Sequence, residues 1–258
     1  MQRIWWILEE VMENEEKAER NNKFQWAVLI ILIVAWIVNI VTKSIASHTL
    51  HIDFSYPFMC SIIFLFYYLI GKVSPVKLFE ISGVKKPKIS KVIFYAIGIF
   101  VIGYGIYVFS EKILQISSKE LVDPADLDLL TALKNVGRIV VILRSASVYF
   151  IQTFFEEFAF RGLLLRKLLS KYNFWIANII HAIVFALFHL PGIFVVKYCS
   201  PNLPINYFVL LLVVPLVGGL LFGYAYAKTD NNLFPSWISH FLLNFSHDLL
   251  LIFFGISI

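Results

Sequence analysis

The chain has 258 residues, of which 59% are hydrophobic and only 15% charged, against about 25% charged residues in typical soluble domains. Its 22 basic and 17 acidic residues give a net charge of +5, but the basic residues lie in short segments between apolar runs, where they set membrane topology, so nucleic-acid binding is not indicated. The composition therefore predicts an integral membrane protein, and its two cysteines are too few for a disulfide framework.

The chain begins with a mixed-charge segment, residues 1–23, in which Trp5 and Trp6 form an apolar patch. We expect an amphipathic segment at the cytosolic membrane surface and no cleaved signal peptide. Apolar runs of about 20 residues, long enough to span a bilayer, then follow at 24–42, 55–71, 92–109, 139–165, 174–190, 207–227 and 233–254. The sequence thus predicts an all-α polytopic membrane helix bundle of about seven transmembrane helices, forming one membrane domain over residues 24–258.

The loops predict the orientation of this bundle. The segment 72–91 carries six lysines and one acid, whereas 110–137 carries five acids and three lysines. Basic loops stay on the cytoplasmic side. We therefore expect a cytoplasmic N-terminus and an outer C-terminus.

Charged residues interrupt the run 139–165, where Glu156, Glu157 and Arg161 follow Arg144. Glu157 and Arg161 are four residues apart, the spacing of a helical ion pair that would support both charges. Glu156 is rotated about 100° away from Glu157 and has no cation on its own helix face, which suits a general base. The same Glu-Glu-x-x-x-Arg spacing occurs at residues 15–20 in a fully polar segment, so membrane burial carries the functional interpretation, since the spacing alone is weak.

Two later runs add polar groups. His189 precedes Pro191 at the end of 174–190, and His240 and Asn244 are four residues apart, on one face of the run 233–254. His247 and Asp248 extend that stripe and are candidates for a supporting shell or an exit path, whereas His181 is interpreted as a core histidine.

A carboxylate, two imidazoles and an amide can activate water and stabilise an oxyanion, which indicates hydrolysis. The set His189, His240 and Glu156 would also suit a catalytic zinc ion, and the residues alone do not decide between the two. The sequence contains no H-E-x-x-H motif and no serine nucleophile motif.

The ordered motifs Glu-Glu-x-x-x-Arg, Phe-x-x-x-His and His-x-x-x-Asn resemble those of the CPBP family, also called the Abi family, over residues 139–250. That family includes type II CAAX prenyl endopeptidases and bacterial proteins linked to bacteriocin self-immunity. The resemblance implies a metalloprotease-like endopeptidase with its catalytic cavity between the four C-terminal helices.

Carried onto this chain, the resemblance implies that Glu156 activates water with His189, that His240 and Asn244 stabilise the oxyanion or help hold a divalent metal such as zinc, and that Glu157 and Arg161 support the geometry. It also implies a bacterial cell membrane setting and a membrane-associated peptide substrate. A non-catalytic immunity or scaffold protein and a proton-coupled transporter are the alternatives.

The depths of these residues pose a geometric problem. At about 1.5 Å per residue, His189 lies roughly 20 Å from its predicted inner helix end, whereas His240 lies only about 10 Å from its own. Straight helices would misalign them, so we expect a tilt, a deeper turn at 228–232 or a helix break.

Overall fold

The computed structural model describes residues 74–113, 124–190, 193 and 205–254. The chain divides into two compact units, Met1–Leu78 and Phe79–Ile258, and the fold is described here for the second. The segment 1–23, with its Glu-Glu-x-x-x-Arg copy, and the predicted spans at 24–42 and 55–71 lie outside the described residues.

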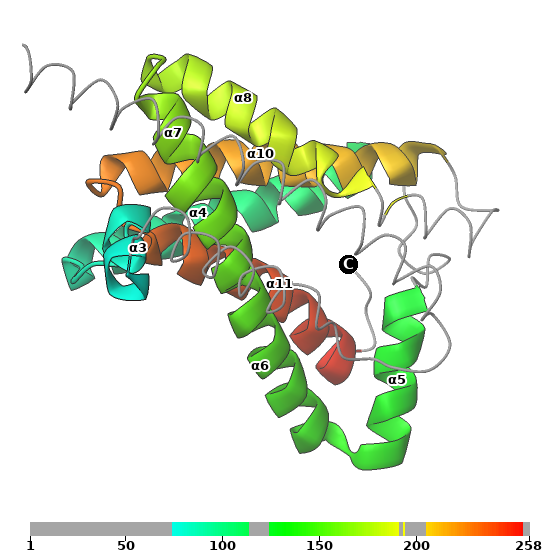
Figure 1. Cartoon of the computed structure of the whole chain (residues 1–258). Coiled ribbons are helices and arrows are strands. Elements are labelled where there is room, and N and C mark those ends of the chain that lie inside the picture. The colour runs from blue at the N-terminus through cyan, green and yellow to red at the C-terminus, as the bar shows by residue number, and fades with distance from the viewer. Residues whose placement is uncertain (1–73, 114–123, 191–192, 194–204, 255–258) are drawn as a thin grey trace, which may run out of the picture. The chain divides into compact units, whose positions relative to one another are not determined.

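All regular structure in the described residues is helical, which confirms the predicted all-α class (Figure 1). The elements are α3 (Pro75–Ser82), α4 (Ile89–Ile113), α5 (Pro124–Val136), α6 (Arg138–Glu157), the π-helix η1 (Phe158–Leu165), α7 (Arg166–Leu169), α8 (Phe174–Leu187), α10 (Ile205–Lys228) and α11 (Phe234–Phe254).

Four helical stretches are long and apolar enough to cross a membrane, and they coincide with four of the predicted spans. They are Ile89–Ile106, Arg138–Leu169, Ile205–Lys228 and Phe234–Phe254, and α8 is a shorter apolar helix. Large apolar side chains point outward along α4, α6 and α8, among them Phe94, Ile139, Leu143, Trp175 and Ile183. Lipid can cover such a surface, so a membrane helix bundle fits the described residues.

The structure differs from the sequence expectation in two segments that we interpreted as loops. Helix α3 lies within the basic segment 72–91, and α5 lies within the acidic segment 110–137. Both helices begin with a proline, whose fixed φ and missing N–H suit the first helical position. The charge of a segment predicts the side of the membrane on which it lies. It does not predict whether the backbone is helical.

Helices α8 and α10 pack closely because small residues line their contact. A Cβ on Gly223 would lie 1.9 Å from Asn178 Oδ1, and a Cβ on Gly219 would lie 3.0 Å from Ala182 Cα. Asn178 also donates a hydrogen bond from Nδ2 to the carbonyl oxygen of Leu220, at 3.0 Å. This contact joins the helix that leads to His189 to the centre of the bundle.

The turn between α10 and α11 is fixed by the segment that precedes α4. Asp230 and Asn231 adopt left-handed backbone conformations, with φ of 60° and 56°, which acidic and amide residues tolerate better than most. Leu233 N–H donates to the Gly83 carbonyl at 3.0 Å, and Asn232 Nδ2 donates to the Lys85 carbonyl at 3.1 Å. These bonds fix the start of α11 and therefore the position of His240.

A break in the α-helical pattern directly follows the two acids. The chain leaves α6 at Glu157 and continues as the π-helix η1, whose wider turns place more residues in each unit of length. This shortens the stretch between the acids and the helix end. Helix α11 packs along α6 (Figure 1), and His240 meets Glu157 directly.

Candidate active site

Glu157 and Arg161 form the predicted ion pair at the junction of α6 and η1. Arg161 Nη1 donates to Glu157 Oε1 at 2.8 Å, and both side chains are completely buried. The Arg161 guanidinium also lies over the rings of Phe185 and Phe222, 4.2 Å and 5.0 Å from their centroids. Aromatic faces and a paired carboxylate are suitable surroundings for a buried cation.

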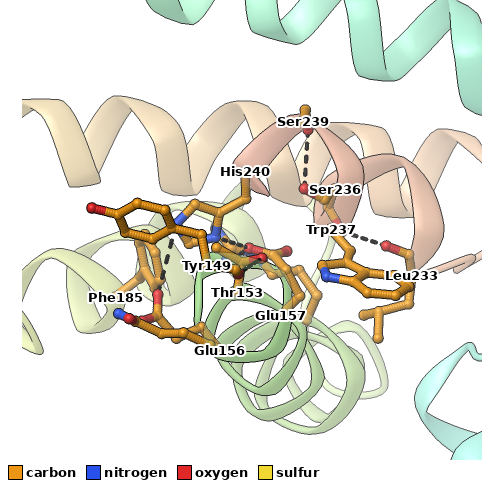
Figure 2. Close-up of polar contacts among 12 residues, drawn as sticks. Tyr149, Thr153, Glu156, Glu157, Phe185, Leu233, Ser236, Trp237, Ser239 and His240 are labelled. Atoms are coloured by element: carbon orange, nitrogen blue, oxygen red, sulfur yellow. Dashed lines mark hydrogen bonds and ion pairs between the residues drawn. The ribbon is translucent and has the colours of Figure 1, made fainter. Parts of the chain in front are cut away.

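His240, from α11, lies between the two acids (Figure 2). Its Nδ1 is 2.8 Å from Glu157 Oε1, and its Nε2 is 3.7 Å from Glu156 Oε2. Because a carboxylate oxygen accepts hydrogen bonds, the imidazole carries a proton on Nδ1 and donates it to Glu157. The ring of His240 also stacks on Phe222, at 4.9 Å between centroids.

Glu156 has a partner that the sequence interpretation missed. Gln152 Nε2 donates to Glu156 Oε1 at 2.9 Å, one helical turn before the acid. The sequence contained a signal for this pair, because residues four positions apart on a helix lie on the same face. This bond occupies Oε1, so Oε2 is the oxygen that faces the His240 imidazole.

His189 lies in the turn that follows α8. Its Nδ1 is 2.8 Å from the carbonyl oxygen of Phe185, which can only accept, so the proton lies on Nδ1 and Nε2 keeps a free lone pair. The ring of Phe185 contacts both His189 and His240, with centroids 4.9 Å and 5.9 Å away. His189 therefore lies on one side of Phe185 and His240 on another, so both belong to the same aromatic-lined cluster.

The formal charges of this cluster do not cancel. Two carboxylates and one guanidinium leave one negative charge when both histidines are neutral. An uncompensated charge in an apolar interior is costly, so the acids depend on Arg161 and on the hydrogen bonds that Gln152 and His240 donate to them. Carboxylates and an imidazole in contact are groups suited to general acid-base chemistry.

The remaining predicted residues lie farther along α11. Asn244 is half-buried, one helical turn after His240. Asp248 is buried and accepts a hydrogen bond from Tyr149 on α6, at 3.1 Å, and its Oδ1 is 3.6 Å from His247 Nδ1. The sequence interpretation did not single out Tyr149. His181, interpreted as a core histidine, is fully buried beside the rings of Phe160 and Phe185.

The ring nitrogens of His189 and His240 are potential metal ligands. In both His189 and His240, Nδ1 is bonded to an oxygen acceptor and Nε2 is left with a lone pair, the usual state of a ligating imidazole. In the part of the chain that the structure describes, however, no group of three or more His, Cys, Asp or Glu residues is arranged to hold a metal ion. The described side chains, as they are placed, therefore do not form a metal site with three protein ligands.

The comparison with protein families points to a class of intramembrane proteases. Residues 138–246 match the family model described as type II CAAX prenyl endopeptidase Rce1-like. The match covers the three motifs, from the first turn of α6 to just beyond Asn244, and confirms the family resemblance given by the sequence. No curated protein and no solved structure matches the chain.

Proposed function

We propose that this protein is an intramembrane endopeptidase that hydrolyses a peptide bond of a membrane-associated peptide with a water molecule activated by Glu156 and His189. The observation that carries the proposal is the convergence of Glu156 and Glu157 on His240, from helices apolar enough to span a membrane. The family match supports the protease class, and the mechanism is argued from the side chains.

Glu156 is the general base in this proposal. Its Oε1 is held by Gln152, so Oε2 takes a proton from water while the free lone pair of His189 Nε2 orients the same molecule. The hydroxide attacks the scissile carbonyl carbon and gives a tetrahedral oxyanion. The proton then passes from Glu156 to the leaving amine nitrogen as the carbon–nitrogen bond breaks.

His240 and Asn244 stabilise the oxyanion. Since the Nδ1 proton of His240 is already donated to Glu157, His240 can donate to the oxyanion only when its Nε2 is protonated as well. Asn244 offers a neutral N–H donor one turn away, and such donors contribute about 10²–10³-fold to turnover in other hydrolases.

The test compares the peptides of cells carrying the wild type with those of cells carrying Glu156→Gln. Glutamine keeps an oxygen that can accept the Gln152 hydrogen bond but cannot take a proton, so we expect the protein to accumulate normally and cleavage to fall by about 10²–10⁴-fold. Glu80→Gln is the matched acid-to-amide control, because Glu80 is exposed on α3. An unchanged peptide pattern in cells carrying Glu156→Gln would contradict the peptidase and leave the non-catalytic scaffold.

A further inference from the structure

Helices α6 and α11 meet in a regular antiparallel register. Glu157 contacts His240, and Tyr149 contacts Asp248. Glu157 follows Tyr149 by eight residues, and Asp248 follows His240 by eight residues. Equal spacing in opposite directions means that the two helices run side by side between these contacts, over about 12 Å.

This register places further polar residues between the two contacts. Thr153 lies four residues from both Tyr149 and Glu157, and Asn244 lies four residues from both His240 and Asp248, so these two occupy the middle of the interface. The Thr153 hydroxyl donates to the Tyr149 carbonyl at 2.7 Å, which leaves its oxygen lone pairs as acceptors. We call the three layers Glu157–His240, Thr153–Asn244 and Tyr149–Asp248 the polar seam.

The two ends of the polar seam differ in their surroundings. At one end Glu157 Oε2 is buried and has no hydrogen-bond partner among the described residues. At the other end Asp248 is 6% exposed, and the side chain of its neighbour His247 is 33% exposed. A line of polar groups therefore leads from a partly exposed histidine to an acid with unused hydrogen-bonding capacity.

Interhelical adhesion alone would not require this composition. Hydroxyl and amide groups hold membrane helices together at lower cost than a buried carboxylate, and the polar seam has a carboxylate at each end. Hydrolysis consumes one water molecule for each bond cleaved, and the outward surfaces of α4, α6 and α8 are apolar. The reaction therefore needs a polar route through the bundle.

We propose that the polar seam conducts water from the Tyr149–Asp248 layer to Glu156 and Glu157, with Asp248 and Tyr149 as positioning residues at its mouth. This inference rests on the proposed hydrolytic function. Each layer offers donors and acceptors to a passing water molecule, and Glu157 Oε2 accepts from the last one.

The test measures water access without relying on activity. The background variant carries Cys60→Ser and Cys199→Ser, and Thr153→Cys is added to it. Open membrane fragments with this variant are exposed to silver ions, which are small, enter aqueous paths and bind thiolates. Protected thiols would be counted by later alkylation in denaturant. Ala225→Cys is the control, since Ala225 is fully buried in an apolar cluster with Ile99 and Phe222.

We expect protection of Thr153→Cys to be on the order of tenfold faster than protection of Ala225→Cys, because a thiol in a dry apolar site stays protonated and inert. Adding Asp248→Leu should slow the protection of Thr153→Cys, whereas Asp248→Asn, which keeps the volume and the acceptor for Tyr149, should slow it less. Ala225→Cys must remain unprotected beside Asp248→Leu, which shows that the bundle is still folded.

Equal rates for Thr153→Cys and Ala225→Cys would overturn the water path, and so would an unchanged rate in Asp248→Leu. If Asp248→Leu unfolds the bundle, the protection rate of Thr153→Cys is measured with Asp248→Asn instead. An unchanged rate in that variant would overturn the role of Asp248. Silver access is independent of cleavage, so the two proposals can fail separately. Rapid protection of Thr153→Cys together with an unchanged peptide pattern in Glu156→Gln would retain the water path and reject the peptidase.

Discussion

Arg161→Met isolates the energetic role of the buried ion pair. Arg161 is completely buried, donates to Glu157 at 2.8 Å and lies over Phe185 and Phe222. Methionine fills a similar volume and can pack against both rings, so the substitution removes mainly the charge. Glu157 is then left as a buried carboxylate with His240 as its remaining donor.

Removing one partner of a buried ion pair costs about 3–5 kcal/mol, because the other charge stays buried without compensation. For chains of 150–250 residues, 1 kcal/mol shifts Tm by about 2–4 °C, so a fall in Tm on the order of 10 °C is expected. Glu157→Gln should cost a similar amount, since it leaves the guanidinium unpaired. The double variant Glu157→Gln/Arg161→Met should be more stable than either single variant.

The assay is thermal unfolding of the purified variants in one detergent, followed by the loss of monodisperse protein after heating. Strict additivity of the two single changes in the double variant would refute the reasoning, because it would mean that the two charges do not compensate each other. A wild-type Tm for Arg161→Met would refute it as well, since the lone carboxylate would then carry no penalty.

Other changes test separate parts of the structure. Gly223→Ala should lower the free energy of unfolding by about 1–3 kcal/mol, because its Cβ would overlap Asn178 Oδ1. Gly98→Ala should not lower it, since the Cβ there would meet nothing within 4 Å, and thermal unfolding of the two variants tests the difference. Gln152→Leu should reduce kcat with little change in KM, because Glu156 loses the donor that fixes Oε1; an unchanged kcat in a peptide cleavage assay would contradict this role. Element analysis of active protein should show no bound metal, and chelation should leave cleavage unchanged. A stoichiometric metal whose removal abolishes cleavage would contradict a reaction carried by Glu156 and the histidines alone.

Much of the fold was predictable, because long apolar runs report membrane spans directly. The limits of Arg138–Leu169 and Phe234–Phe254 follow from hydropathy within a few residues. Helices α3 and α5 were missed because short polar helices lack that signal. The π-helix was missed because its hydrogen bonds respond to packing around Glu157 and Arg161, and no residue type marks it.

The candidate site was predictable in its members and less so in its connections. Spacing within one helix indicated the pair of Glu157 with Arg161, and the same rule applied to Gln152 and Glu156 would have found that pair too. The contact between Glu157 and His240 joins residues 83 positions apart. No local pattern contains it, because it depends on how α11 is anchored by the bonds of Leu233 and Asn232 to the segment before α4.

That anchoring explains why His240 can connect the two acids. Glu156 and Glu157 lie about 100° apart on α6, so a side chain that contacts both must reach two directions at once. A side chain from a second helix can do so if it enters between them, and His240 does this with one ring nitrogen toward each carboxylate. The imidazole suits this position because its nitrogens lie on opposite sides of a rigid ring, and because it can carry one proton or two. The same residue therefore holds α11 against α6 and contacts both acids, so a substitution at His240 must be tested for stability before its effect on cleavage is interpreted.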